Sequence, residues 1–117
     1  MVKKRIESFG HAFRGIGTLV RTQPNAKIHL AATVLVVCLG VFLDVSTIEW
    51  AVLAMACGFV WAAEALNSAL EFLADRVAPE KHELVRKAKD TAAAGVLAAS
   101  IAAAAAGLFI FLPHILK

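Results

Sequence analysis

The sequence predicts an all-α membrane protein, in which an N-terminal amphipathic surface helix precedes three transmembrane helices. Hydrophobic residues make up 60% of the 117 residues. The mean hydropathy of +0.74 is above what a soluble domain usually carries. Long apolar runs alternate with short polar connectors. The chain length favours a single domain over residues 1–117.

Residues 1–25 are predicted to form the surface helix. Its apolar side chains recur at steps of three and four residues, and basic side chains occupy the other faces. We expect the apolar face to enter the lipid and the basic face to meet anionic headgroups. The segment lacks the short apolar core and cleavage site of a secretory signal. Pro24 disfavours a helical conformation at Gln23 and should end this element.

The three transmembrane helices are predicted over residues 28–45, 49–76 and 86–114. The uncharged residues 28–43 give about 24 Å of helix, slightly less than the hydrocarbon core of roughly 30 Å, so flanking residues should extend this span. The second helix is longer than a bilayer requires, and its acidic end should emerge from it. The third is rich in alanine and glycine, which favours close approach of another helix.

Several single residues carry simpler expectations. Cys38 and Cys57 lie in apolar runs without metal-ligand spacing, so we expect both to be small buried hydrophobic residues. His29 is expected to be a neutral residue at the membrane interface. Trp50 is placed like a residue of an aromatic belt, whereas Trp61 is expected to pack within the protein.

The basic residues predict the orientation. Of the twelve Lys and Arg residues, six precede Ile28 and five lie between Arg76 and Lys89, whereas the short connector at residues 44–49 has two acids and no base. The positive-inside rule therefore places the N-terminus and the second connector on the cytoplasmic side.

Polar residues of the second span lie on one helix face. This stripe comprises Glu64, Asn67, Ser68, Glu71 and Asp75. Acids in a membrane helix are costly, so they indicate a functional site. Glu64 lies deepest and is a candidate proton acceptor, and Glu71 beside Asn67 offers oxygen ligands that suit Mg²⁺.

Two residues at the cytoplasmic start of the third helix complete this pattern. Lys89 supplies a cation for phosphates, and Asp90 an acceptor for a sugar or base. Together with the stripe they favour phosphoryl transfer at a membrane surface, although no P-loop or protein-kinase motif is present. Spacing alone leaves two alternatives open, a small proton-coupled transporter and a non-catalytic membrane assembly protein.

Three motifs resemble those of the prokaryotic diacylglycerol kinase and undecaprenol kinase family: residues 64–71, residues 80–84, and residues 87–90 followed by alanines. The resemblance covers nearly the whole chain. It implies a homotrimer with active sites shared between neighbours, in the bacterial cytoplasmic (inner) membrane. It also implies that MgATP phosphorylates the hydroxyl of a membrane lipid, undecaprenol or diacylglycerol. We expect no nucleic-acid partner.

The resemblance also implies residue roles. Glu64 would be the general base, Asn67 a positioning residue, and Glu71 a metal ligand that also contacts nucleotide. His11 stands where an aromatic residue near the nucleotide is frequent. The residues implied to border or bind the nucleotide are Lys4, His11, Glu71, Glu80, Lys81, His82, Lys89 and Asp90.

Gln23 departs from the family pattern. Many members carry a second acidic metal ligand at this position. An amide oxygen can coordinate Mg²⁺ but brings no charge, so we predict weaker Mg²⁺ binding that depends mainly on Glu71 and the ATP phosphates. Residues 25–29 resemble the undecaprenol-kinase branch more than the enterobacterial diacylglycerol-kinase branch.

Overall fold

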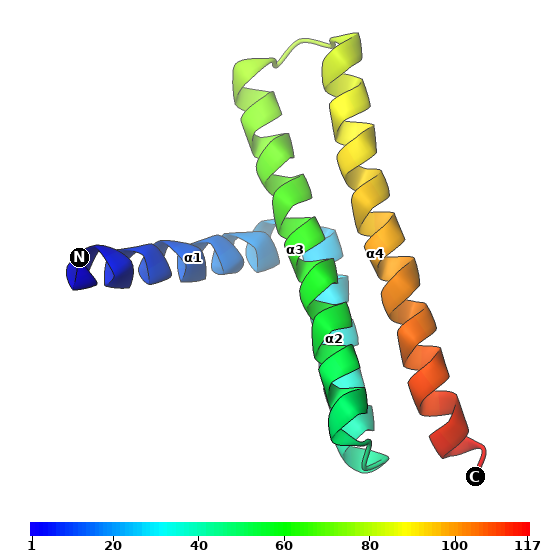
Figure 1. The fold of residues 1–117 in the computed structure, drawn as a ribbon. Helices are drawn as coiled ribbons and strands as arrows, with labels where there is room; N and C mark the ends of the chain where they lie inside the picture. The colour runs from blue at the N-terminus through cyan, green and yellow to red at the C-terminus, as the bar shows by residue number, and fades with distance from the viewer.

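A computed structural model describes residues 1–117 and consists of four helices. They are α1 (Val2–Thr22), α2 (Pro24–Phe42), α3 (Thr47–Val77) and α4 (Glu83–Ile115). The last three are long and apolar enough to cross a membrane. The predicted all-α class with three helices of membrane-spanning character is therefore confirmed. These three run alongside one another, whereas α1 extends away from them (Figure 1).

The corner between α1 and α2 depends on Gln23 and Pro24. Gln23 is extended, with φ −108° and ψ 116°, and breaks the helix. Proline is well suited to a first helical turn because the N–H that it lacks would have no partner there and its φ is already helical. Pro24 therefore begins α2, which starts four residues before the expected span at residue 28. Leu19 and Ala26 are buried at this corner.

The turn between α2 and α3 is closed by local polar contacts. Asp44 has a left-handed φ of 51°, which Asp tolerates better than most residues. The Ser46 hydroxyl accepts from the backbone N–H of Glu49 at 3.2 Å, and the Glu49 carboxylate accepts from the backbone N–H of Ser46 at 2.9 Å. This capping box starts α3. His114 Nε2 lies 3.1 Å from Glu49 Oε1, which joins the end of α4 to the start of α3.

A small apolar cluster lies beside this turn. Its buried members are Val45, Leu53, Ile110 and Phe111. Trp50, expected in an aromatic belt, packs against Gly40 of α2 so closely that a Cβ on Gly40 would overlap the indole ring. This contact fixes how α2 meets α3.

Most of the apolar surface of the chain faces outward. Only 12 of the 117 residues are buried, which is too few to enclose the large hydrophobic side chains of α2, α3 and α4. The prediction that both cysteines are buried is wrong for Cys38, which lies exposed on the outer face of α2, and Cys57 is half-buried. An apolar exterior of this extent suits contact with lipid or with further copies of the chain.

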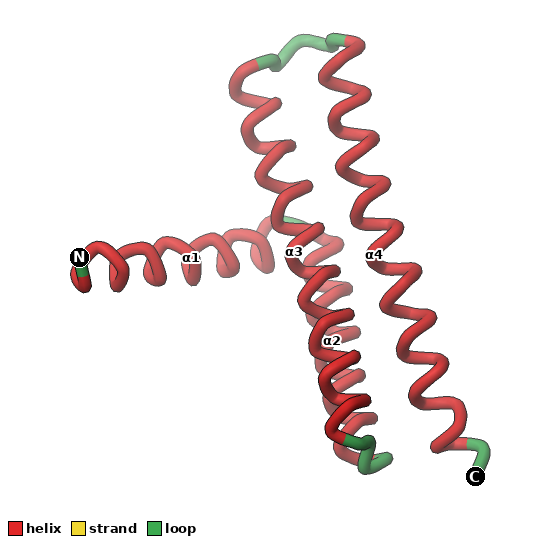
Figure 2. The backbone as a smooth tube through the Cα atoms, viewed as in Figure 1, coloured by secondary structure: helices red, strands yellow, loops and turns green.

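The helices α3 and α4 continue beyond the corner of α1 and α2 and end in a hairpin (Figures 1 and 2). The 31 residues of α3 correspond to about 46 Å, more than a hydrocarbon core of roughly 30 Å. The hairpin end therefore has room to stand outside the apolar region.

Candidate active site

The polar stripe of α3 changes in burial along its length. Glu64, Asn67 and Ser68 are 2%, 8% and 1% exposed. Glu71 is half-buried and Asp75 is exposed near the hairpin. The polar stripe therefore runs from a buried carboxylate, Glu64, towards solvent at Asp75.

Two side chains hold the Glu64 carboxylate. The Ser68 hydroxyl donates to Glu64 Oε1 at 3.3 Å, and His29 Nε2 of α2 lies 3.4 Å from Glu64 Oε2. His29, expected to be a neutral residue at the membrane interface, is half-buried against this acid. Sequence reasoning missed the pair because it depends on how α2 packs against α3.

Asn67 lies beside a cavity between α2, α3 and α4. The cavity has a volume of about 260 Å³ and is bordered by Asn25, His29, Asn67 and Ser100 among others. The buried Oδ1 of Asn67 has no hydrogen-bond partner. An unpaired buried acceptor is costly, so a ligand that supplied a donor or a cation would be stabilised here.

Glu71 and Asn67 are the residues of the stripe predicted to bind Mg²⁺. They lie one helical turn apart, and both present oxygen atoms of the kind that Mg²⁺ prefers. No group of three or more His, Cys, Asp or Glu side chains gathers into a complete metal site. Phosphate oxygens and water would occupy the remaining coordination positions, as is usual for Mg²⁺ at nucleotides.

Gln23 is half-buried at the corner between α1 and α2. Its side-chain amide nitrogen donates to Thr22 Oγ1 at 3.3 Å, so the amide binds the neighbouring residue at this corner. A role of Gln23 in metal binding stays a prediction.

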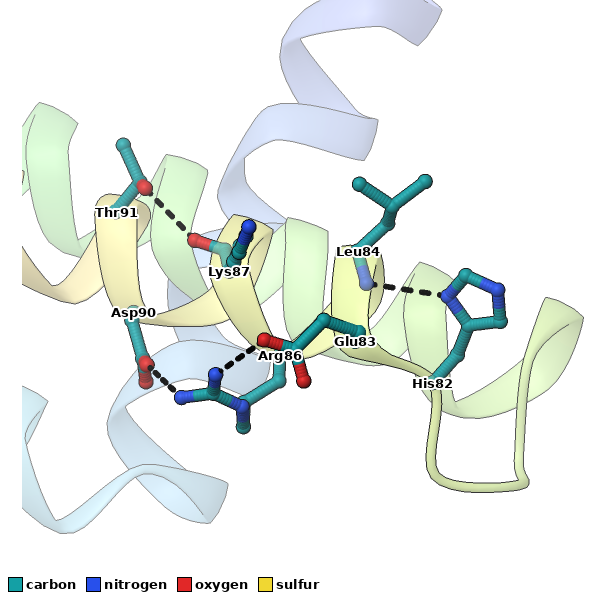
Figure 3. A network of polar contacts seen from close by, with 7 residues as sticks. All are labelled: His82, Glu83, Leu84, Arg86, Lys87, Asp90 and Thr91. Carbon is teal, nitrogen blue, oxygen red and sulfur yellow. Dashed lines mark hydrogen bonds and ion pairs between the residues drawn. The ribbon is translucent and has the colours of Figure 1, made fainter.

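A cleft of about 550 Å³ lies between the ends of α3 and α4 at the hairpin. It brings together five of the residues expected near nucleotide: Glu80, Lys81, His82, Lys89 and Asp90. Its volume is in the range of small-molecule sites. Glu80 and Lys81 are exposed in the connector, whereas His82 Nδ1 accepts from the backbone N–H of Leu84 at 3.1 Å and caps α4 (Figure 3).

Ion pairs line this cleft. Lys89 Nζ donates to Asp75 Oδ1 at 2.8 Å, which joins α4 to the stripe of α3. Arg86 donates to Asp90 Oδ2 at 3.3 Å and to Glu83 Oε1 at 2.6 Å (Figure 3). Exposed pairs contribute roughly 0–1 kcal/mol, so phosphate oxygens can compete for these cations.

Arg86 is a cleft residue that sequence reasoning missed. Its spacing from Glu83 and Asp90, three and four residues, is the signal that could have found it, because side chains at these intervals meet on a helix.

Lys4 and His11 lie outside the hairpin cleft. Both are exposed on α1, whose N-terminal half extends away from α3 and α4 (Figure 1). His11 Nδ1 contacts the guanidinium of Arg14 on the same helix. One chain by itself therefore does not bring these two residues to the hairpin cleft.

Comparison with known proteins gives consistent matches. The sequence pattern of the family "Prokaryotic diacylglycerol kinase" matches residues 10–111. An undecaprenol kinase of Bacillus subtilis is 37% identical over 109 residues, which cover 93% of this chain and 89% of that protein.

Two diacylglycerol kinases are similar as well. That of Synechocystis sp. is 40% identical over 111 residues, covering 94% of this chain and 63% of that protein. That of Escherichia coli is 34% identical over 98 residues, covering 84% of this chain and 80% of that protein.

Proposed function

Because this chain belongs to the prokaryotic diacylglycerol kinase family and is a lipid kinase, we propose that it transfers the γ-phosphate of ATP to a membrane lipid hydroxyl at the cytoplasmic face. The acceptor class is undecaprenol or diacylglycerol, and the reaction requires Mg²⁺. The observation that carries the proposal is a buried carboxylate, Glu64, at the deep end of a polar stripe that leads to an open cleft.

Glu64 is the proposed general base. Its Oε2 is buried and has no hydrogen-bond partner, so its lone pairs are available to accept a proton. Ser68 binds only the other oxygen. A general base must reach the proton that it removes within hydrogen-bond distance, and Glu64 lies deepest in the stripe, where a hydroxyl arriving from lipid would come.

The hairpin cleft is the proposed nucleotide site. Lys89 and Arg86 offer cations to the phosphates, and Asp90 an acceptor for the sugar or base. The polar stripe on α3 then connects this cleft, at Asp75, with Glu64. Glu80, Lys81 and His82 are proposed to border the adenine.

Glu71 and Asn67 would hold Mg²⁺ against the ATP phosphates. The bound ion would neutralise charge on the phosphoryl group during transfer. Asn67 Oδ1 is the buried acceptor without a partner, which supports a ligand at this position.

The proposed reaction is an in-line displacement. The lipid hydroxyl oxygen forms a bond to the γ-phosphorus, and the bond from this phosphorus to the bridging oxygen of the β-phosphate breaks. The hydroxyl proton passes to Glu64 Oε2, and the electron pair of the broken bond leaves with ADP. The products are a lipid phosphate and ADP.

We further propose that the chain acts as a homotrimer whose subunits share sites, with α1 on the cytoplasmic membrane surface. Phe9 and Phe13 of α1 are 67% and 70% exposed, which supports burial of this face in lipid. Lys4 and His11 are remote from the cleft of their own chain, which supports contact with a neighbouring subunit.

The test is phosphate transfer by the purified protein in detergent micelles. We would incubate it with ATP radiolabelled at the γ-phosphate, Mg²⁺, and either diacylglycerol, undecaprenol or no added lipid. We expect label in the lipid extract with at least one of the two alcohols and its loss when EDTA is added. Absence of labelled lipid with both alcohols would overturn the proposal.

A further inference from the structure

We propose that His29 is a positioning residue for the reaction, which holds the Glu64 carboxylate so that Oε2 faces the lipid hydroxyl. This inference rests on the proposed kinase function and adds a residue to its machinery. It begins from the distance of 3.4 Å between His29 Nε2 and Glu64 Oε2.

Both atoms of this contact are buried, and neither has a hydrogen-bond partner. His29 Nε2 is close enough to restrict the position of the Glu64 carboxylate. It makes no hydrogen bond to Oε2, so a lone pair of this oxygen stays free to take the proton. Ser68 restrains the other oxygen, Oε1. Glu64 is therefore held on both sides while one acceptor position stays free.

The ring of His29 is itself fixed by its neighbours. The Trp61 indole N–H donates to Thr33 Oγ1 at 2.9 Å, and the Thr33 hydroxyl donates to the backbone carbonyl of His29 at 2.7 Å. The His29 and Trp61 rings meet edge to face, with centroids 6.4 Å apart. These contacts link α2 to α3 and set the direction in which the imidazole points.

Electrostatics also favours this pair. Glu64 is 2% exposed on a helix of membrane-spanning character, where an isolated carboxylate is costly. His29 is the basic side chain that lies within ion-pair distance of it. Because burial makes a charge sensitive to a single neighbour, loss of the imidazole should disturb both the position and the charge of the base.

The position of His29 shows that the pair is not sealed off. His29 and Ser100 border two cavities, the one beside Asn67 and a second of about 290 Å³ whose lining is mainly apolar. The pair thus lies where a partly polar cavity meets a mainly apolar one. A lipid that carries one hydroxyl needs such a boundary next to the base.

Two variants separate positioning from simple packing. His29→Phe keeps a ring against Trp61 but removes Nε2, whereas His29→Gln loses the ring and keeps a donor. For His29→Phe we expect kcat to fall about ten- to a hundredfold, because small displacements of reacting groups have effects of this size. The KM for MgATP should be unchanged, and His29→Gln should recover part of the lost kcat.

The deciding comparison is His29→Phe in a Glu64→Gln background. If His29 acts through Glu64, the second substitution adds little further loss to the residual rate. The inference would be overturned if His29→Phe lowered the rate by the same factor in the Glu64→Gln background as in the natural protein. It would also be overturned if His29→Phe alone left kcat unchanged.

A readout independent of activity separates this inference from the proposed function. In protein with ¹⁵N-labelled histidine, the His29 ring signal should shift on Glu64→Gln and stay unshifted on Glu49→Gln, which alters the carboxylate beside His114. An unmoved His29 signal would overturn the pairing even in an active kinase. An inactive natural protein with a shifted signal would count against the kinase reaction alone.

Discussion

At the residue scale, the central feature is the buried Glu64 carboxylate, which binds Ser68 and lies 3.4 Å from His29. Helical periodicity alone puts Glu64, Asn67 and Ser68 on one face, because the spacing of side chains around a helix is a local property. The structure buries that face. The contact of Glu64 with His29 could not be predicted in the same way, since it joins two helices whose packing no local pattern specifies.

Gln23 is the predicted metal ligand whose amide stands where the family resemblance implies an acid. We predict that Gln23→Glu lowers the Mg²⁺ concentration for half-maximal lipid phosphorylation by roughly three- to tenfold, since ligand charge raises affinity for divalent cations. The measurement is a Mg²⁺ titration of activity at saturating lipid. Gln23→Met, which resembles glutamine in size but lacks the amide, is the control and should raise the requirement. An unchanged requirement in both variants would remove Gln23 from the metal site.

At the element scale, local signals decide where the helices break and where they begin, whereas tertiary contacts decide how the helices pack. Pro24 marked the corner after α1, and the capping box of Ser46 and Glu49 begins α3 two residues before the expected start. The packing of Trp50 on Gly40 was not predictable, because an interfacial tryptophan and a buried one look alike in sequence.

The packing of Trp50 on Gly40 leads to a prediction about the stability of the fold. Gly40→Ala should destabilise the fold by about 1–3 kcal/mol, because the added methyl group displaces the Trp50 ring. Thermal unfolding in detergent, followed by circular dichroism, measures it. Gly58→Ala is the matched control, since a Cβ there meets nothing within 4 Å. Trp50→Leu should relieve the strain, so the double variant should lose less than the sum of the two single losses. Equal effects at Gly40 and Gly58 would contradict the account.

At the scale of the whole molecule, one chain does not bring all of the predicted site residues together. Its large apolar side chains face outward, and α1 carries Lys4 and His11 away from the hairpin cleft (Figure 1). Composition predicted a membrane protein because hydropathy is a property of the whole chain. The proposed homotrimer rests on the family resemblance, because the small side chains of α4 indicate close helix contact but not how many copies make it.

Sharing of sites between subunits predicts complementation. We expect Lys4→Glu and Glu64→Gln to be poorly active alone, and mixed assemblies to recover activity. With random equal mixing, roughly a quarter of the sites combine a natural α1 with a natural α3, so recovery should approach a quarter of the natural rate. Unfolding, mixing and reassembly in micelles, followed by the phosphate-transfer assay, measures it. Activity no higher than the mean of the two variants would exclude sites that take α1 and α3 from different chains.

The central claim is that a buried carboxylate on α3 removes the proton from a lipid hydroxyl during phosphate transfer. The direct measurement compares label transfer from γ-labelled ATP to lipid by the natural protein, Glu64→Gln and Glu49→Gln, with nucleotide binding measured in each. Both variants lose a carboxylate of α3 that lies beside a histidine, but only Glu64 lies on the polar stripe. The account predicts a fall in kcat of about 10²–10⁴-fold for Glu64→Gln, with nucleotide still bound, and a rate close to the natural one for Glu49→Gln. Undiminished transfer by Glu64→Gln would contradict it.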